Sequence, residues 1–151
     1  RDINLLDGGA PFYTTYRTSD SRHISVGAIE DKFYLEFITK LDLKLDELPN
    51  RTDKSNWPKL KDIFQEIIKT KTMREWEEIY FGTDACVAPV LNFEEAFVDP
   101  HNKYRGIFPK AFNIIQPKPA PDLSVTPAPK ITDKHKIKLT EAEVFSQWGI
   151  D

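Results

Sequence analysis

The sequence predicts an α+β fold, in which a small antiparallel sheet packs with short helices and an extended, proline-rich segment follows. Three observations carry this prediction. Residues 12–29 alternate like a β-hairpin, two later stretches show helical apolar spacing behind capping residues, and residues 117–129 hold five of the eleven prolines. We therefore expect an α+β domain over residues 1–116, followed by an extended segment and a final helix over residues 117–151.

The hairpin is predicted from β-favouring residues on both sides of a polar turn. Residues 12–16 and 23–26 flank Ser19-Asp20-Ser21, whose side chains can bond their own backbone and so end a strand. Apolar residues at helical spacing then predict a short amphipathic helix over residues 33–41, with Glu30 at its N-cap or in its first turn.

Two further helices are indicated by the residues that begin them. Asp53 and Ser55 offer caps and Pro58 suits a first helical turn. Thr72 and Glu75 match a capping box, in which each side chain satisfies a free amide of the first turn. The first of these helices carries the apolar stripe Leu60, Ile63, Phe64, Ile67 and Ile68.

Three shorter elements are expected towards the end of the chain. Residues 86–88, just before a proline, predict a short buried strand. Asn92 with Glu95 caps a brief helix, and Thr140 with Glu143 caps a last one. Because that last helix carries apolar residues, we expect it to dock on a partner or on another domain.

Composition and motifs exclude several classes of function. The chain has 21 basic and 24 acidic residues, a net charge of −3 and no long block of either sign, so we expect no nucleic-acid partner. No stretch approaches the roughly 18–20 apolar residues of a membrane span, so we expect no membrane partner. The sequence has no glycine-rich phosphate loop, and His23, His101 and His135 are far apart, so no metal site is expected.

The single cysteine invites a catalytic interpretation, which the surrounding residues do not favour. Cys86 lies in an apolar run, where a thiol is expected to be a small core residue with a raised pKa. One thiol also cannot form an internal disulfide. We therefore expect Cys86 to have a structural role.

Several long segments resemble one enzyme family. Residues 4–18, Val26-Gly27-Ala28-Ile29-Glu30 and residues 82–91 resemble segments of the small domain of α-methylacyl-CoA racemases. Those enzymes belong to the wider CoA-transferase family III. Shorter matches follow in the same order, so that the resemblance spans about residues 4–127.

This resemblance implies a fold and a reaction. The family forms interlocked homodimers, in which each active site lies between the large domain of one subunit and the small domain of its partner. The reaction removes and returns the C2 proton of a 2-methylacyl-CoA through an enolate-like intermediate. CoA is part of the substrate, and no further cofactor is implied.

The same resemblance implies what this part of the enzyme would lack. The catalytic bases of the family, a histidine and an aspartate, belong to the large domain and match nothing in this chain. The chain would then be a C-terminal small-domain part that is inactive alone. Fatty-acid and bile-acid metabolism, in peroxisome or mitochondrion, are implied as its setting.

Five residues match site positions of the family. By this resemblance Glu30 would be the carboxylate partner of the catalytic histidine, Tyr13 and Ile29 would line the substrate pocket, and Leu6 and Asp7 would border the acyl group. Each has a structural alternative. Glu30 could support a helix N-terminus through the macrodipole, Tyr13 and Ile29 could be ordinary strand residues, and the diglycine after Asp7 could simply mark a turn.

The chain departs from the family in two places. Asp31 stands where the family usually has proline directly after the glutamate, and aspartate is acceptable in a first helical turn. Beyond residue 129 the likeness weakens, and Lys134-His135-Lys136 matches the usual Gly-x-His-Thr only faintly.

Two other functions stay open. The first is a CoA-transferase of the same fold, which would move CoA between acids through a large-domain aspartate nucleophile. The second is a non-catalytic module that binds an acyl-CoA or another subunit, because an isolated domain can expose surface that a partner normally covers.

Overall fold

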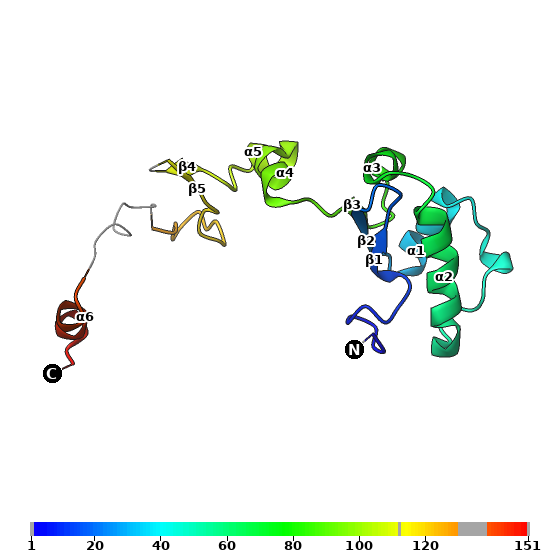
Figure 1. Ribbon diagram of the computed structural model, residues 1–151, viewed down its shortest axis with the longest axis horizontal. Coiled ribbons are helices and arrows are strands. Elements are labelled where there is room, and N and C mark those ends of the chain that lie inside the picture. The colour runs from blue at the N-terminus through cyan, green and yellow to red at the C-terminus, as the bar shows by residue number, and fades with distance from the viewer. Residues whose placement is uncertain (1, 112, 130–138, 151) are drawn as a thin grey trace. The chain divides into compact units, whose positions relative to one another are not determined.

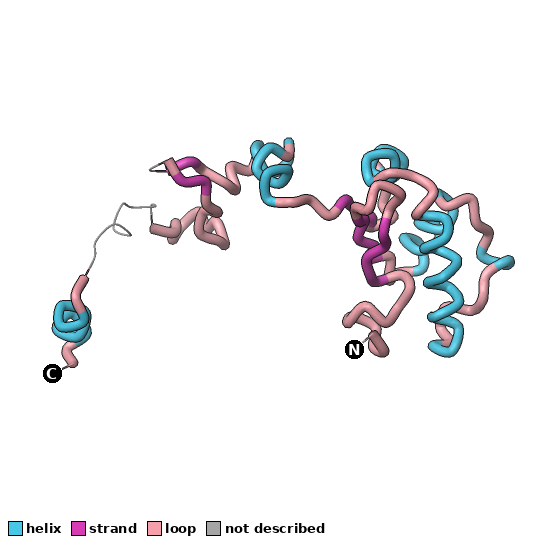
Figure 2. Tube along the Cα trace, in the orientation of Figure 1, coloured by secondary structure: helices cyan, strands magenta, loops and turns pink. Residues whose placement is uncertain are grey.

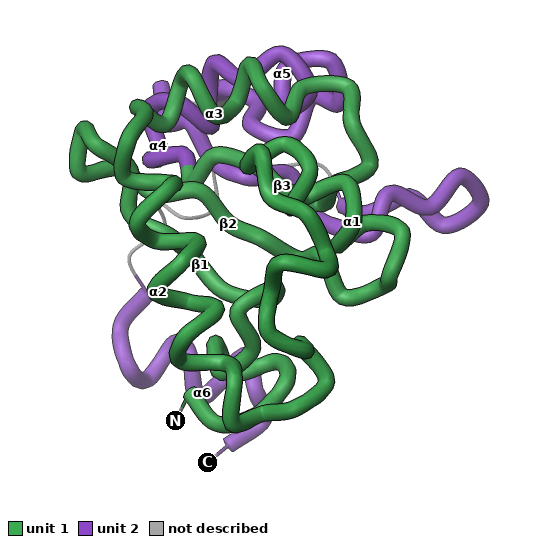
Figure 3. The backbone as a smooth tube through the Cα atoms, turned by 90° about the vertical axis from the view of Figure 1, so that its right-hand side faces the viewer, with its two compact units in different colours: residues 1–90 green, residues 91–151 purple. Residues whose placement is uncertain are grey.

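The computed structural model describes residues 2–111, 113–129 and 139–150 (Figure 1). Contacts divide the chain into two compact units, residues 1–90 and residues 91–151 (Figure 3). This division falls earlier than the domain boundary expected after residue 116, which stays a prediction. The possible match at Lys134-His135-Lys136 lies outside the described residues.

The first unit contains a three-stranded antiparallel sheet with the helices to one side of it (Figures 1 and 2). Its order is β1 (Tyr13–Arg17), β2 (His23–Gly27) and β3 (Val87–Pro89). Tyr13 lies opposite Gly27, and Ser25 pairs with Ala88. The predicted hairpin is therefore confirmed, and the predicted short strand is present one residue later than expected, but none of its residues is buried.

The hairpin turn is tied to the helix that begins at Met73. The Asp20 carboxylate accepts hydrogen bonds from the Thr18 hydroxyl at 2.5 Å and from the Met73 amide at 3.3 Å. The bond from Thr18 and the backbone amides together lower the pKa of Asp20. A polar turn residue thus fixes both the end of β1 and the start of a helix far along the chain.

Three helices accompany the sheet, as predicted: α1 (Asp31–Lys40), α2 (Trp57–Ile68) and α3 (Met73–Tyr80). The loop between α1 and α2 holds two short 3-10 turns, η1 (Leu45–Glu47) and η2 (Lys54–Asn56). The first helix begins two residues earlier than expected. The predicted capping box at the start of α3 is present.

The inner face of the sheet and the helices enclose an aromatic core. Phe64 of α2 is fully buried and contacts the rings of Tyr16, Tyr34 and Phe37. The Gln65 side chain also bonds the amide and the carbonyl of Arg17, so α2 is attached to the edge of β1. The helix α3 contributes Met73, Trp76 and Tyr80 to the same core, which is thus made by contacts between the sheet and all three helices.

The placement of Cys86 corrects one expectation. Cys86 is exposed and precedes β3, whereas Ala85 is fully buried. Cys86 has a left-handed backbone with φ of 53°, which turns the chain between the buried Ala85 and the strand. Its side chain therefore lies outside the core, and the expectation that Cys86 is a small core residue is wrong. The apolar run in the sequence does not show this turn of the backbone.

The second unit holds short elements: α4 (Phe93–Val98), α5 (Pro100–Tyr104), β4 (Lys110–Ala111), β5 (Ile114–Ile115) and α6 (Glu141–Trp148). Capping boxes begin α4 and α6, as predicted. The helix α5 was not predicted, although an aspartate before a proline begins it in an ordinary way. Residues 117–129 contain neither helix nor strand. The docking of α6 on a partner or another domain stays a prediction.

Candidate functional site

An open hollow of about 580 Å³ lies on the sheet face that the core does not use. Side chains alternate across a strand, so Tyr16, Ile24 and Val26 face the core. The neighbouring positions face the other way and contribute to the hollow. Its lining includes Gly8, Tyr13, Thr15, Ser25, Gly27 and Cys86.

The floor of the hollow is flat because β2 has a glycine opposite Tyr13. A Cβ added at Gly27 would lie 3.9 Å from the Tyr13 ring and 3.8 Å from the Cys86 carbonyl oxygen. The Gly27 amide also donates to that carbonyl at 2.9 Å. The Tyr13 ring therefore lies beside a stretch of backbone without a side chain at Gly27. Tyr13, which was predicted to line the substrate pocket, borders this hollow.

The Asp7 carboxylate holds the turn before β1 by accepting hydrogen bonds. Its carboxylate accepts from the amide of Asn4 at 2.8 Å and from the Asn4 side chain at 2.9 Å. Desolvation alone would raise the pKa of Asp7, but the hydrogen bonds outweigh it and the pKa is lowered overall. The neighbouring Leu6 is exposed. The bonds to Asn4 support the turn interpretation of Asp7, and neither residue lines the hollow itself.

The diglycine is required by the geometry of this turn. Gly8 has φ of 91°, and a Cβ at Gly9 would lie only 2.5 Å from the Asn4 carbonyl oxygen. The Lys61 ammonium of α2 donates to the Gly8 carbonyl at 2.5 Å. The turn is therefore held against α2, and Gly8 contributes to one edge of the hollow.

Glu30 is the N-cap residue of α1, with φ of −72° and ψ of 147°. Its side chain is exposed and makes no capping hydrogen bond. Although Cys86 is exposed, partial desolvation by its neighbours raises the pKa of its thiol. The negative charges of Glu30 and Asp84 raise this pKa further, so the thiol stays protonated near neutral pH. The expected raised pKa of Cys86 is confirmed, and the Glu30 carboxylate lies near enough to contribute to it.

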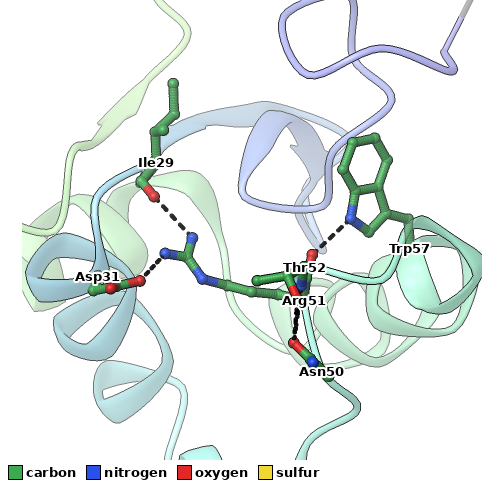
Figure 4. Close-up of polar contacts among 6 residues, drawn as sticks. All are labelled: Ile29, Asp31, Asn50, Arg51, Thr52 and Trp57. Carbon is green, nitrogen blue, oxygen red and sulfur yellow. Dashed lines mark hydrogen bonds and ion pairs between the residues drawn. The ribbon is translucent and has the colours of Figure 1, made fainter.

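The segment around Glu30 is held by Arg51, a residue that the sequence did not indicate (Figure 4). The Arg51 guanidinium donates to the Ile29 carbonyl at 2.8 Å and forms an ion pair with Asp31. It also lies over the rings of Phe12 at 4.7 Å and Tyr34 at 4.4 Å. Ile29 itself is half-buried against the core and does not line the hollow.

Residues 2–133 match the family model described as CoA-transferase family III. The chain belongs to this family. Human α-methylacyl-CoA racemase is 52% identical over 129 residues, which are 85% of this chain and 34% of that protein. The mouse enzyme of the same name is 44% identical over 151 residues, covering 99% of the chain and 40% of the enzyme. A CaiB/baiF CoA-transferase family protein of Caenorhabditis elegans is 34% identical over 91 residues, 60% of the chain and 25% of that protein.

The family III chain therefore spans between 34% and 40% of the length of the racemases that it matches. The expected family and the expected α+β fold class are confirmed. The described part of the chain has no cluster of three side chains suited to a metal ion. Within that part, no helix has the length and apolar character to cross a bilayer.

The sequence of this family III chain held one indirect signal for Arg51. Asp31 is an acidic residue in the first turn of α1, and a carboxylate at that position can pair with a cation. The sequence spacing does not identify this cation as Arg51, because Arg51 lies twenty residues later. Only the folded loop that contains η1 and η2 brings it to the start of α1. The roles assigned to Glu30, Tyr13, Ile29, Leu6 and Asp7 stay predictions.

Proposed function

We propose that the protein containing this chain is an α-methylacyl-CoA racemase. It would remove the C2 proton of a 2-methylacyl-CoA on one face and return a proton on the other, without loss of CoA. The support is the 52% identity over 129 residues to the human protein of that name. The two bases would come from a large domain, as the resemblance implies, and this chain would supply one wall of the site.

In this proposal Glu30 pairs with the catalytic histidine of another subunit in a homodimer. Its carboxylate is exposed and makes no capping bond to α1, so it is available to accept a bond from outside the unit. A carboxylate bonded to imidazole orients the ring and favours its protonated form. Glu30 would then tune a base without touching the substrate.

The hollow on the sheet face is the proposed contact for the acyl group. Tyr13 offers an aromatic wall, and the turn that carries Leu6 and Asp7 borders the same side through Gly8. Ile29 does not line the hollow, so its proposed contact with the substrate would come from the segment before α1. Branched fatty acyl or bile-acid thioesters, in peroxisome or mitochondrion, are the substrates and compartments that we propose.

A CoA-transferase is the second candidate, because the family itself and the nematode relative carry that description. Such an enzyme would move CoA to an acid acceptor. A racemase instead exchanges the C2 proton and keeps the thioester intact. The two candidates can therefore be separated by supplying a free carboxylic acid and measuring whether a new thioester forms.

The test is proton NMR of the full-length protein with a chiral 2-methylacyl-CoA in deuterated water. We expect deuterium to enter C2 in the wild type. Glu30→Gln should slow the exchange by about tenfold or more, because loss of a carboxylate that orients a functional imidazole typically costs about 10–100-fold. Glu78→Gln is the matched control, since Glu78 is an exposed glutamate of α3 that pairs only with Arg74 among the bonds of the described residues.

The outcomes separate the alternatives. No exchange in the wild type would contradict the racemase proposal, and transfer of CoA to an added acid would favour the second candidate. If Glu30→Gln exchanges as fast as Glu78→Gln but is less stable, Glu30 acts only on the helix N-terminus. This chain alone should show no exchange, because the bases that we propose lie elsewhere.

A further inference from the structure

We propose that Arg51 is a positioning residue for Glu30, acting through the residues on both sides of it. The inference rests on the proposed role of Glu30. One guanidinium binds the carbonyl of Ile29 and the carboxylate of Asp31, which directly precede and follow the glutamate (Figure 4). Glu30 is thus fixed from both sides, while its own side chain remains unbonded within α1.

Arg51 can do this because it is itself firmly held. Its side chain is only 14% exposed and lies over the Phe12 and Tyr34 rings. Its backbone carbonyl accepts a bond from the indole nitrogen of Trp57 at 2.8 Å. Trp57 is buried at the start of α2 and packs edge-on against Phe12. The loop that carries Arg51 is therefore anchored to the core on both its backbone and its side chain.

Asp31 leaves the Glu30 backbone without the restriction that a proline at the same position would impose. A proline at the first helical position fixes its own φ and restricts the residue before it to ψ of about 120–160°. Glu30 has ψ of 147° although Asp31 imposes no such restriction. We infer that the bonds of Arg51 maintain the Glu30 backbone that proline would otherwise maintain.

The two bonds of Arg51 are unequal. The Asp31 side chain is 99% exposed, so water and salt screen its ion pair, and exposed pairs of this kind contribute little. The bond to the Ile29 carbonyl is made by a mostly buried guanidinium and is not screened in the same way. Removing Arg51 should therefore affect Glu30 much more than removing the charge of Asp31.

The experiment uses the full-length protein and the C2 exchange assay, with kcat and KM measured for each variant. Arg51→Gln should lower kcat about tenfold, and by no more than Glu30→Gln does, with little change in KM, because Arg51 acts only through the position of Glu30. Asp31→Asn should lower kcat by less than threefold, since it removes only the screened pair. Arg74→Gln is the control, because Arg74 likewise bonds two partners, the carboxylates of Glu77 and Glu78, but on the exposed surface of α3.

Rescue separates positioning from mere loss of stability. Adding Asp31→Pro to Arg51→Gln should restore most of kcat, because proline restricts the Glu30 backbone without a guanidinium. Proline suits that position, the first residue of α1, whose amide has no partner within the helix. Arg51→Lys, which keeps a charge and one donor direction, should fall between the wild type and Arg51→Gln.

Each result supports or overturns a defined claim. If the wild type exchanges and Arg51→Gln matches Arg74→Gln, the positioning role is wrong. The positioning role is also wrong if the variant that carries both Arg51→Gln and Asp31→Pro folds but stays as slow as Arg51→Gln. If Arg51→Gln does not fold, the role is wrong when Arg51→Lys retains the full kcat. If the wild type itself shows no exchange, the proposed function fails and the inference fails with it.

Discussion

Replacing Phe64 should remove the centre of the aromatic core. Its ring is fully buried and packs edge-on against Tyr16 at 6.2 Å, Tyr34 at 6.4 Å and Phe37 at 5.1 Å. A buried Phe→Ala change costs about 3–5 kcal/mol, whereas each aromatic pair adds about 0.5–1.5 kcal/mol beyond burial. We expect Phe64→Ala to lower the free energy of unfolding by about 4 kcal/mol and Phe64→Leu, which keeps most of the volume, by about 2 kcal/mol.

This loss would be a large fraction of the stability of the first unit. At roughly 0.05–0.15 kcal/mol per residue, 90 residues supply about 5–13 kcal/mol. Urea unfolding of this chain can be followed by tryptophan fluorescence, because Trp57 and Trp76 are both buried in that unit. The control is Phe81→Ala, where the side chain is 86% exposed, and its effect should stay within about 0.5 kcal/mol. A cost below about 1 kcal/mol for Phe64→Ala would refute this account of the core.

Two further predictions concern titrating groups. The pKa of Asp20 is lowered from 3.8, so its charge stabilises the fold above that value and this contribution disappears as pH falls through the lowered pKa. Asp20→Asn should therefore flatten the loss of stability below about pH 4 in urea unfolding curves measured at each pH, and an unchanged slope would contradict the bonds seen at the hairpin turn. Burial and the Glu30 charge raise the pKa of Cys86, so iodoacetamide should modify this thiol more slowly than a free cysteine at pH 8. Glu30→Gln removes one cause and should speed the reaction, whereas an equal rate would show that the two groups do not interact.

The helices and strands were largely predictable because their signals are local. A capping box acts over three residues, so the sequence alone located the starts of α3, α4 and α6. Strand alternation likewise predicted the hairpin formed by β1 and β2. The helix α5 shows the limit of this approach, because its short length provides no apolar periodicity and only its capping residues mark it.

The sequence by itself determined the α+β class, the order of the main elements and, through long matching segments, the family to which the chain belongs. Only the tertiary structure decided that Cys86 lies outside the core and that Arg51 holds both neighbours of Glu30. The physical reason is the range of the interactions. Caps and alternation depend on residues a few positions apart, whereas the ion pair of Arg51 with Asp31 joins residues twenty positions apart that a folded loop brings together.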